Sequence, residues 1–283
     1  MTSTPDIAVD CACELGEGPT WDAHRQRLLW LDIDAQILHE LADDGHHCAT
    51  SVEQRVTAVV PDAHGGLIAA TGGSVNRMDD VGRIGSLVAA LPLEGEGLTN
   101  DGRCDPFGRF WIGTVDRSGA KRAGLFCVTE AGSVTRIRNE VSLSNGLDWS
   151  PDGRVCHYVD SFAHRIDNIH LDADGFPVRS ETLVEIESTP DGLTVDVEGG
   201  VWVALWDGGA VHRYTPDGRL DRVVSVPGGF ITSCAFGGPQ STTLFITTAR
   251  VGLSDAELRT LPHAGALFAL DVGVAGRGYT PFG

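Results

Sequence analysis

Short apolar runs alternate with polar turns along almost the whole chain. Six times a turn, most often of the form D-x-x-G, precedes such a run, as DPFG does before the run FWIG at 110–113. Equivalent turn positions recur every 40 to 46 residues, a spacing that suits one β-propeller blade of about 40 to 50 residues. The six turns begin at Asp22, Asp62, Asp105, Ser150, Asp196 and Gly237.

A second alternating run follows the first inside each repeat, for example at 37–41, 75–78 and 125–128, and it ends in another polar turn. Period-2 alternation between Gly- and Asp-rich turns is typical of antiparallel hairpins. The sequence therefore predicts an all-β, six-bladed β-propeller with four antiparallel strands per blade. We interpret the run after each D-x-x-G turn as the inner strand. One short helix is expected after Ser254, where acidic residues follow a good N-cap.

The ring of blades must close, because open first and last edges would pair with other chains. The stretch 7–12 has strand character and precedes the first turn. We expect it to complete the blade that the C-terminal strands begin. Since the repeat runs nearly end to end, residues 1–283 are expected to form a single domain.

Composition narrows the classes of partner. Lys and Arg number 21 against 39 Asp and Glu, for a formal net charge of −18, which disfavours nucleic acid and anionic membranes and favours cations. The chain has no run of 18 apolar residues, and its first residues lack the basic and apolar regions of a signal peptide. No membrane partner and a cytoplasmic location are expected, while the oligomeric state stays open.

The seven cysteines are odd in number and scattered, without a C-x-x-C pair, so we expect reduced, mostly packing residues. Cys11 and Cys13 could bind a soft metal, but residues two apart on a strand share a face, which favours a core role. His46 and His47 adjoin a turn and are expected to be a solvated loop pair.

One position, five residues before the first turn residue, carries an oxygen-bearing side chain in every repeat. Equivalent positions in a radial array converge on the axis at one end, so these side chains should meet at the mouth of the central tunnel. Asn-Gly and Asp-Gly are also common turn dipeptides, but the shared register favours a site. The six positions hold Glu17, Thr57, Asn100, Asn145, Asp191 and Thr232.

Two carboxylates and two amides gathered at one mouth would repel one another unless a positive charge lies between them. Because the ligands are hard oxygens without His or Cys, Ca²⁺, Mg²⁺ or Mn²⁺ fits better than a structural zinc, although an open site could take Zn²⁺. Thr57 and Thr232 are neutral, so the cation is expected off-axis, toward the other four blades. Trp206 and His164 could also reach the pocket.

Several segments form a set of motifs: GEGPTW at 16–21, NDGRCDP at 100–106, SNGLDWS at 144–150 and PDG at 190–192, together with 232–238 and 247–250. This set resembles the SMP-30/gluconolactonase/luciferin-regenerating-enzyme family, also called regucalcin-like proteins. The resemblance covers essentially the whole chain in the right order. It implies a six-bladed propeller and metal-dependent hydrolysis, most often of sugar lactones.

By this resemblance Glu17, Asn145 and Asp191 take the places of metal ligands, and Asn100 takes that of a substrate-binding residue. We expect Asp101, beside it, to bind substrate too. One divalent cation is implied, with Ca²⁺ as the first expectation and Mn²⁺, Mg²⁺ or Zn²⁺ as alternatives. The cation would polarise the lactone carbonyl, and Asp191 would be the catalytic general base toward water. The expected partner is a small lactone or ester.

The chain departs from the family pattern at two places. Leu98 stands where sugar lactonases commonly carry an Arg, and the loop at 116–118 reads DRS where some members present a Glu. A more apolar lactone or ester therefore also fits. The alternatives are a phosphotriesterase or aryl-esterase on the same site, and a calcium- or ligand-binding propeller without turnover. The polar loop 116–123 is a candidate lid.

Overall fold

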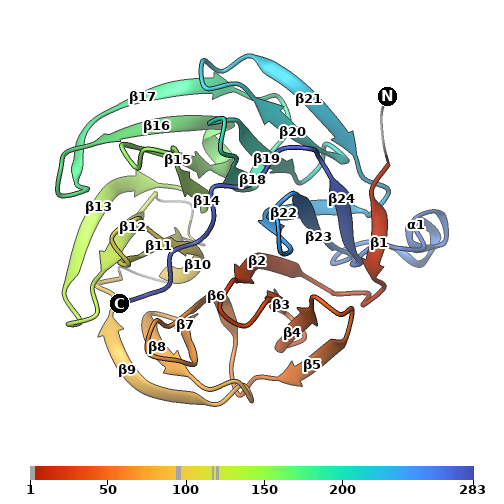
Figure 1. The fold of residues 1–283 in the computed structure, drawn as a ribbon, viewed down its shortest axis with the longest axis horizontal. Helices are drawn as coiled ribbons and strands as arrows, with labels where there is room; N and C mark the ends of the chain where they lie inside the picture. The colour runs from red at the N-terminus through yellow and green to blue at the C-terminus, as the bar shows by residue number, and fades with distance from the viewer. Residues whose placement is uncertain (1–3, 94–96, 117, 119–120) are drawn as a thin grey trace.

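A computed structural model of the protein describes residues 4–93, 97–116, 118 and 121–283. Within these residues, six four-stranded antiparallel sheets surround a central axis (Figure 1). This arrangement confirms the predicted six-bladed β-propeller. The loop 116–123 is described only in part, because 117, 119 and 120 lie outside the described residues, so its expected lid role stays a prediction.

Five blades use four consecutive strands each, in order from the axis to the rim. The first blade contains β2 (Gly16–Asp22), β3 (Arg27–Asp32), β4 (Ile37–Ala42) and β5 (His47–Ser51). The second contains β6 (Val56–Pro61), β7 (Leu67–Thr71), β8 (Ser74–Met78) and β9 (Ile84–Ala90). The third contains β10 (Gly97–Cys104), β11 (Phe110–Asp116), β12 (Ala123–Val128) and β13 (Val134–Val141).

The next two blades repeat the pattern. The fourth contains β14 (Ser144–Trp149), β15 (Val155–Asp160), β16 (Arg165–Leu171) and β17 (Pro177–Glu185), with the 3₁₀ helix η1 (Ser161–Ala163) after β15. The fifth contains β18 (Pro190–Val195), β19 (Val201–Leu205), β20 (Ala210–Tyr214) and β21 (Leu220–Ser225).

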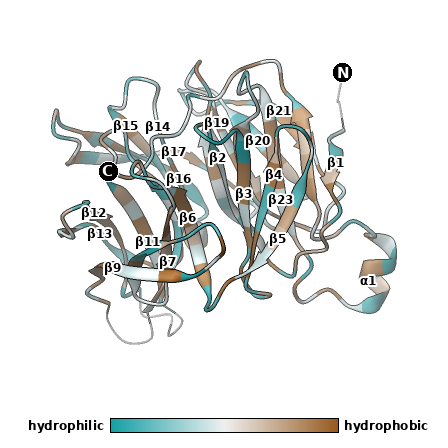
Figure 2. Ribbon diagram, turned by 60° about the horizontal axis from the view of Figure 1, so that its bottom comes forward, coloured by the Kyte–Doolittle hydropathy of each residue, from teal (hydrophilic) through white to brown (hydrophobic). Residues whose placement is uncertain are grey.

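The sixth blade joins the two ends of the chain, as predicted. It consists of β22 (Phe230–Gly237), β23 (Thr243–Ala249), β24 (Leu267–Asp271) and the N-terminal β1 (Asp6–Val9), which pairs antiparallel with β24. The predicted helix is also present as α1 (Asp255–Thr260), and Ser254 and Glu257 form its capping box. α1 projects from the rim beside β1 (Figures 1 and 2).

The assignment of the apolar runs to inner strands was wrong. The innermost strands are β2, β6, β10, β14, β18 and β22, and the apolar runs form the second strands, such as β3 and β19 (Figure 1). A second strand is buried on both faces between neighbouring blades, and all five residues of β19 are buried. It therefore reads as a continuous apolar run, whereas an inner strand faces the tunnel and carries polar residues.

In the third and fifth blades a turn aspartate ties the turn to the second strand. Asp196 Oδ1 accepts a hydrogen bond from the backbone N of Gly200 at 2.8 Å, and its Oδ2 accepts one from the Trp202 indole at 2.8 Å. Asp105 accepts a hydrogen bond from the Trp111 indole in the same way at 3.0 Å. In these two blades the Asp and the Trp thus form one structural device.

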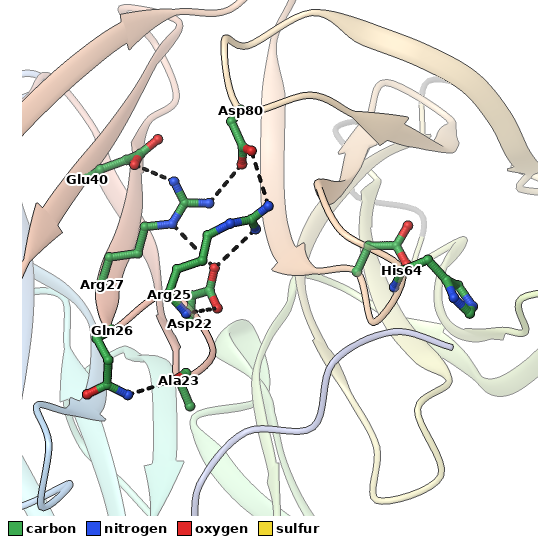
Figure 3. Close-up of polar contacts among 9 residues, drawn as sticks. Asp22, Ala23, Arg25, Gln26, Arg27, Glu40, His64 and Asp80 are labelled. Atoms are coloured by element: carbon green, nitrogen blue, oxygen red, sulfur yellow. Dashed lines mark hydrogen bonds and ion pairs between the residues drawn. The ribbon is translucent and has the colours of Figure 1, made fainter.

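Ion pairs connect the first two blades near the end of the propeller that carries the D-x-x-G turns, which we call the turn end. Arg27 Nη2 lies 2.8 Å and Arg25 Nη2 lies 3.2 Å from the carboxylate of Asp80 (Figure 3). Arg27 also contacts Asp22 at 3.3 Å and Glu40 at 2.5 Å. Because exposed pairs contribute about 0–1 kcal/mol each, they orient the blades more than they stabilise them.

The C-terminal segment 276–283 packs across the turn end. Phe282 is fully buried there, and the Tyr279 hydroxyl accepts a hydrogen bond from the backbone N of Phe236 at 3.0 Å. The Arg103 guanidinium lies 4.7 Å from the Tyr279 ring centroid and pairs with Asp148 at 2.8 Å. These groups fill the axis at this end.

The prediction for the cysteines was confirmed, whereas the one for the His46–His47 pair was wrong in part. All seven cysteines are free thiols and five are buried, as expected. The prediction of a solvated loop pair was wrong for His47, which lies in β5, is half-buried and stacks on the Trp30 ring at 5.4 Å. No helix in the described part of the chain is long and apolar enough to cross a membrane.

Candidate functional site

Each inner strand carries a register irregularity at the ring position. In β10, β14 and β18 the shifts lie between Thr99 and Gly102, Ser144 and Leu147, and Pro190 and Leu193. Bulges of this kind re-aim a side chain and are frequent beside active sites. The predicted ring residues therefore lie in strand bulges and not in turns. Shifts also occur at the ring positions of β2, β6 and β22.

The glycines that follow two of these residues allow neighbouring inner strands to approach closely. A Cβ at Gly146 would collide with the backbone N of Leu193, and a Cβ at Gly192 would collide with Ser233 Oγ. The pairs Asn145-Gly146 and Asp191-Gly192 are thus explained by interblade packing.

A cavity of about 670 Å³ lies at the other end of the axis, which is the mouth. Thr57 and Thr232 do not line it, because their hydroxyls bond elsewhere: Thr57 Oγ1 to Thr99 Oγ1 at 2.9 Å, and Thr232 Oγ1 to the Gly16 carbonyl at 2.5 Å. The structure brings the other four ring residues together on its wall: Glu17, Asn100, Asn145 and Asp191.

Hydrogen bonds orient the two amides. Asn100 Nδ2 donates to Asn145 Oδ1 and to the Ser144 carbonyl, both at 2.8 Å. Asn145 Nδ2 donates to Ser161 Oγ at 2.8 Å. Since the N–H groups of Asn100 are used, its amide oxygen is the group left for a ligand.

The carboxyl groups lie in an environment that disfavours their charge. Burial, and then the charge of Asp101, raises the pKa of Glu17 to about 8. Burial, and then the charge of Glu17, raises the pKa of Asp191 well above its usual range. Asp191 is 5% exposed, and its Oδ1 has no hydrogen-bond partner within the described residues. A bound cation would relieve both the repulsion and the unpaired oxygen.

The donor set fits a hard cation only if the amides take part. No group of three or more His, Cys, Asp or Glu side chains in the described ranges could hold a metal ion. Glu17 and Asp191 supply two carboxylates, so further ligands must come from amide oxygens or from water. Such an all-oxygen set suits Ca²⁺, Mg²⁺ or Mn²⁺.

Other predicted residues lie outside the cavity wall. Asp101 accepts a hydrogen bond from the backbone N of Gly102 at 2.7 Å and does not line the cavity. Leu98 is half-buried in β10 and does not line it either. His164 also lies off the wall, with Nδ1 3.3 Å from the Ser188 carbonyl. Trp206 does reach the cavity, as expected.

Sequence reasoning missed the loop residues of the wall. Ser161 orients Asn145, and Phe162 follows it in η1. They lie between strands, where no periodic signal exists. The only cue is their place directly after the second strand β15, the position that Trp206 occupies after β19. The remaining wall residues that were missed are Leu15, Asp34, Leu143, Thr189, Asp207 and Val251.

A second hollow, of about 280 Å³, lies at the turn end between the first two blades and the C-terminal segment. Its acids already have partners. Asp22 pairs with Arg25 and Arg27 (Figure 3), and Asp62 pairs with Arg77. These carboxylates do not need a cation, in contrast to those at the mouth.

Comparison with known proteins agrees with the fold. The family model described as SMP-30/Gluconolactonase/LRE-like region matches residues 15–250. Regucalcin of Danio rerio is 34% identical over 98% of both chains, and a 6-deoxy-6-sulfogluconolactonase of Pseudomonas putida is 35% identical over 98% of this chain and 97% of its own. The crystal structure of a calcium-binding regucalcin from Agrobacterium tumefaciens aligns with a TM-score of 0.90 at 31% identity, over 99% of this chain and 97% of the other. The chain belongs to the SMP-30/gluconolactonase/LRE-like family.

Proposed function

We propose that this protein is a divalent-metal-dependent lactonase that opens a cyclic ester to the hydroxy acid. The observation that carries the proposal is the unpaired, buried Asp191 Oδ1 beside the half-buried Glu17 carboxyl in a cavity at the mouth. Relatives named as lactonases, such as the Pseudomonas putida protein, support the same chemistry.

Glu17, Asn145 and Asp191 would hold the cation, and their oxygens match what Ca²⁺ prefers. Ca²⁺ is our first choice because a similar structure is described as calcium-binding, with Mn²⁺, Mg²⁺ and Zn²⁺ as alternatives. When bound, the cation supplies Lewis acidity to the ester carbonyl and a counter-charge for the developing oxyanion.

The remaining steps belong to side chains of the protein. Asp191 accepts a proton from the attacking water as general base, and Asn100 accepts a hydrogen bond from the substrate through its free amide oxygen. Water adds to the carbonyl carbon, the ring C–O bond breaks, and the alkoxide takes up a proton to give the hydroxy acid. Asp101 lies within electrostatic reach of Glu17 and Asp191 and keeps the site negative.

The test is hydrolysis of a panel of lactones before and after EDTA, with Ca²⁺, Mn²⁺, Mg²⁺ or Zn²⁺ restored. An activated aryl ester and an organophosphate triester in the panel distinguish the esterase alternative, and metal binding without any turnover would point to a binding protein. Asp191→Asn should lower kcat/KM by roughly 10² to 10⁴, because a ligand charge and the base are both lost. Asp174→Asn, in an exposed turn, is the control. Full activity in EDTA, or in Asp191→Asn, would contradict the proposal.

A further inference from the structure

Five apolar side chains line the mouth cavity together with its acids: Leu15, Leu143, Phe162, Trp206 and Val251. The Phe162 side chain is 65% exposed, and the Trp206 ring stacks on Phe230 with centroids 4.6 Å apart. An apolar wall beside a few polar groups is typical of a small-molecule site, and an exposed aromatic ring gains free energy when a ligand covers it.

Phe162 is held close to the candidate metal centre. It is the middle residue of η1, and its neighbour Ser161 is 1% exposed and accepts the hydrogen bond from Asn145. The 3₁₀ turn ends at His164, whose φ of 51° is left-handed. This single turn therefore places the exposed Phe162 ring next to Ser161, the residue that orients Asn145, a proposed metal ligand.

The polar part of the wall is negative. Four carboxylates line the cavity, and none of the described wall residues is a Lys or Arg. A single divalent cation offsets two of these charges, and Arg55, which pairs with Asp34 at 3.0 Å, offsets a third. An anionic substrate would still meet the charge of Asp207. The four acids are Glu17, Asp34, Asp191 and Asp207.

Apart from the Ser161 hydroxyl and the Trp206 indole N–H, the side-chain hydrogen-bond donors among the described wall residues are already used. The amide N–H groups of Asn100 and Asn145 already have acceptors, and the Thr189 hydroxyl donates to Asp207 at 3.3 Å. A ring with many hydroxyl groups needs donors as well as acceptors when it is desolvated. This wall matches such a ring poorly.

We propose that the cavity selects an uncharged lactone with an alkyl or aryl substituent, which packs against Phe162 and Trp206. This inference rests on the proposed lactonase function and adds the class of substrate. The ester end would lie at the carboxylates that hold the cation, where Asp191 activates the water, and the apolar side chains bind the substituent.

The test compares kcat/KM for γ-butyrolactone, γ-octalactone, D-glucono-1,5-lactone and the anionic D-glucaro-1,4-lactone. We expect γ-octalactone to exceed both γ-butyrolactone and gluconolactone by about tenfold or more, since each buried methylene is worth roughly 0.8 kcal/mol. Glucarolactone should be the poorest substrate. Phe162→Ala should raise KM for γ-octalactone about tenfold with kcat unchanged, and should leave γ-butyrolactone unaffected. The matched control is Phe107→Ala, because Phe107 is also exposed but lies in a D-x-x-G turn at the turn end, away from the cavity.

Preference for gluconolactone or glucarolactone, or an equal effect of Phe162→Ala on both γ-lactones, would overturn the inference. If no lactone is hydrolysed with any metal, the proposed lactonase function fails. A binding measurement then tests the inferred substrate class by itself. Calorimetry with 5-butyl-2-pyrrolidinone, the lactam counterpart of γ-octalactone, should then show about tenfold weaker binding to Phe162→Ala than to the wild type. Equal affinity of the two proteins would refute it.

Discussion

Glu17→Gln should stabilise the metal-free protein while it weakens metal binding. Burial and the charge of Asp101 raise the pKa of Glu17 from 4.5 to about 8. Between these values the folded protein binds a proton that the unfolded chain has released. The stability of the metal-free protein should therefore fall as the pH rises from about 4.5 to 8 and level off above that. Gln has no charge to lose, so the variant should lack the part of this slope that Glu17 contributes, while Asp191, whose pKa burial also raises, keeps its own part.

The pKa values set the size of the effect. A pKa rise from 4.5 to about 8 corresponds to at most about 5 kcal/mol at pH 8. The Glu17 side chain is half-buried, and water screens such a group, so we expect about 2–3 kcal/mol. For a chain of this length that is a rise in Tm of about 5 °C.

The assay is thermal unfolding of wild type and Glu17→Gln in EDTA at pH 5, 6, 7 and 8, with Glu14→Gln, an exposed neighbour, as control. The variant should melt higher than wild type, and the gap should widen with pH. Ca²⁺ at a hundred times its Kd should stabilise the wild type by about 2.7 kcal/mol and the variant far less, so the difference in melting temperature between them should close. A variant that melts lower than wild type in EDTA at pH 8, or a gap independent of pH, would refute the reasoning.

Two further predictions concern parts of the fold away from the mouth. Burial, and then the charge of His47, lowers the pKa of His39 from 6.5 to about 4. Between these pH values the unfolded chain binds a proton that the folded protein does not. The free energy of unfolding should therefore fall as the pH falls from 6.5 to 4, by at most about 3 kcal/mol. His39→Gln should flatten this acid limb in urea unfolding at pH 4.5 and 7, and an unchanged slope would contradict the assignment. Phe282→Ala should cost about 3–5 kcal/mol in urea unfolding without changing KM, because Phe282 packs at the turn end; a changed KM would show that the two ends are coupled.

The sequence predicted the blade repeat, the ring closure and the four oxygen-bearing wall residues because each is tied to a period. A repeat period shows which positions are equivalent in the blades, but it does not show how far each strand lies from the axis. The apolar runs were therefore assigned to the inner strands, although they form the second strands. Loops carry no periodic pattern, so Ser161 and Phe162 were not predicted as wall residues. His47 was misread because its role depends on stacking with Trp30 across β3 to β5, a contact that no local pattern encodes.

The sixfold repeat gives six equivalent bulges, but their chemistry makes the mouth one-sided. Thr57 and Thr232 satisfy their own hydroxyls within the ring, so neither creates a need for a ligand. The second blade contributes no residue to the cavity wall among those described, whereas the loops after β15 and β19 supply Phe162 and Trp206. Asp191, which needs a cation, therefore lies on the same blade as Trp206 and on the blade next to Phe162. A substrate that satisfies both the cation site and these two rings must present its ester to Asp191 and its apolar part to the fourth and fifth blades.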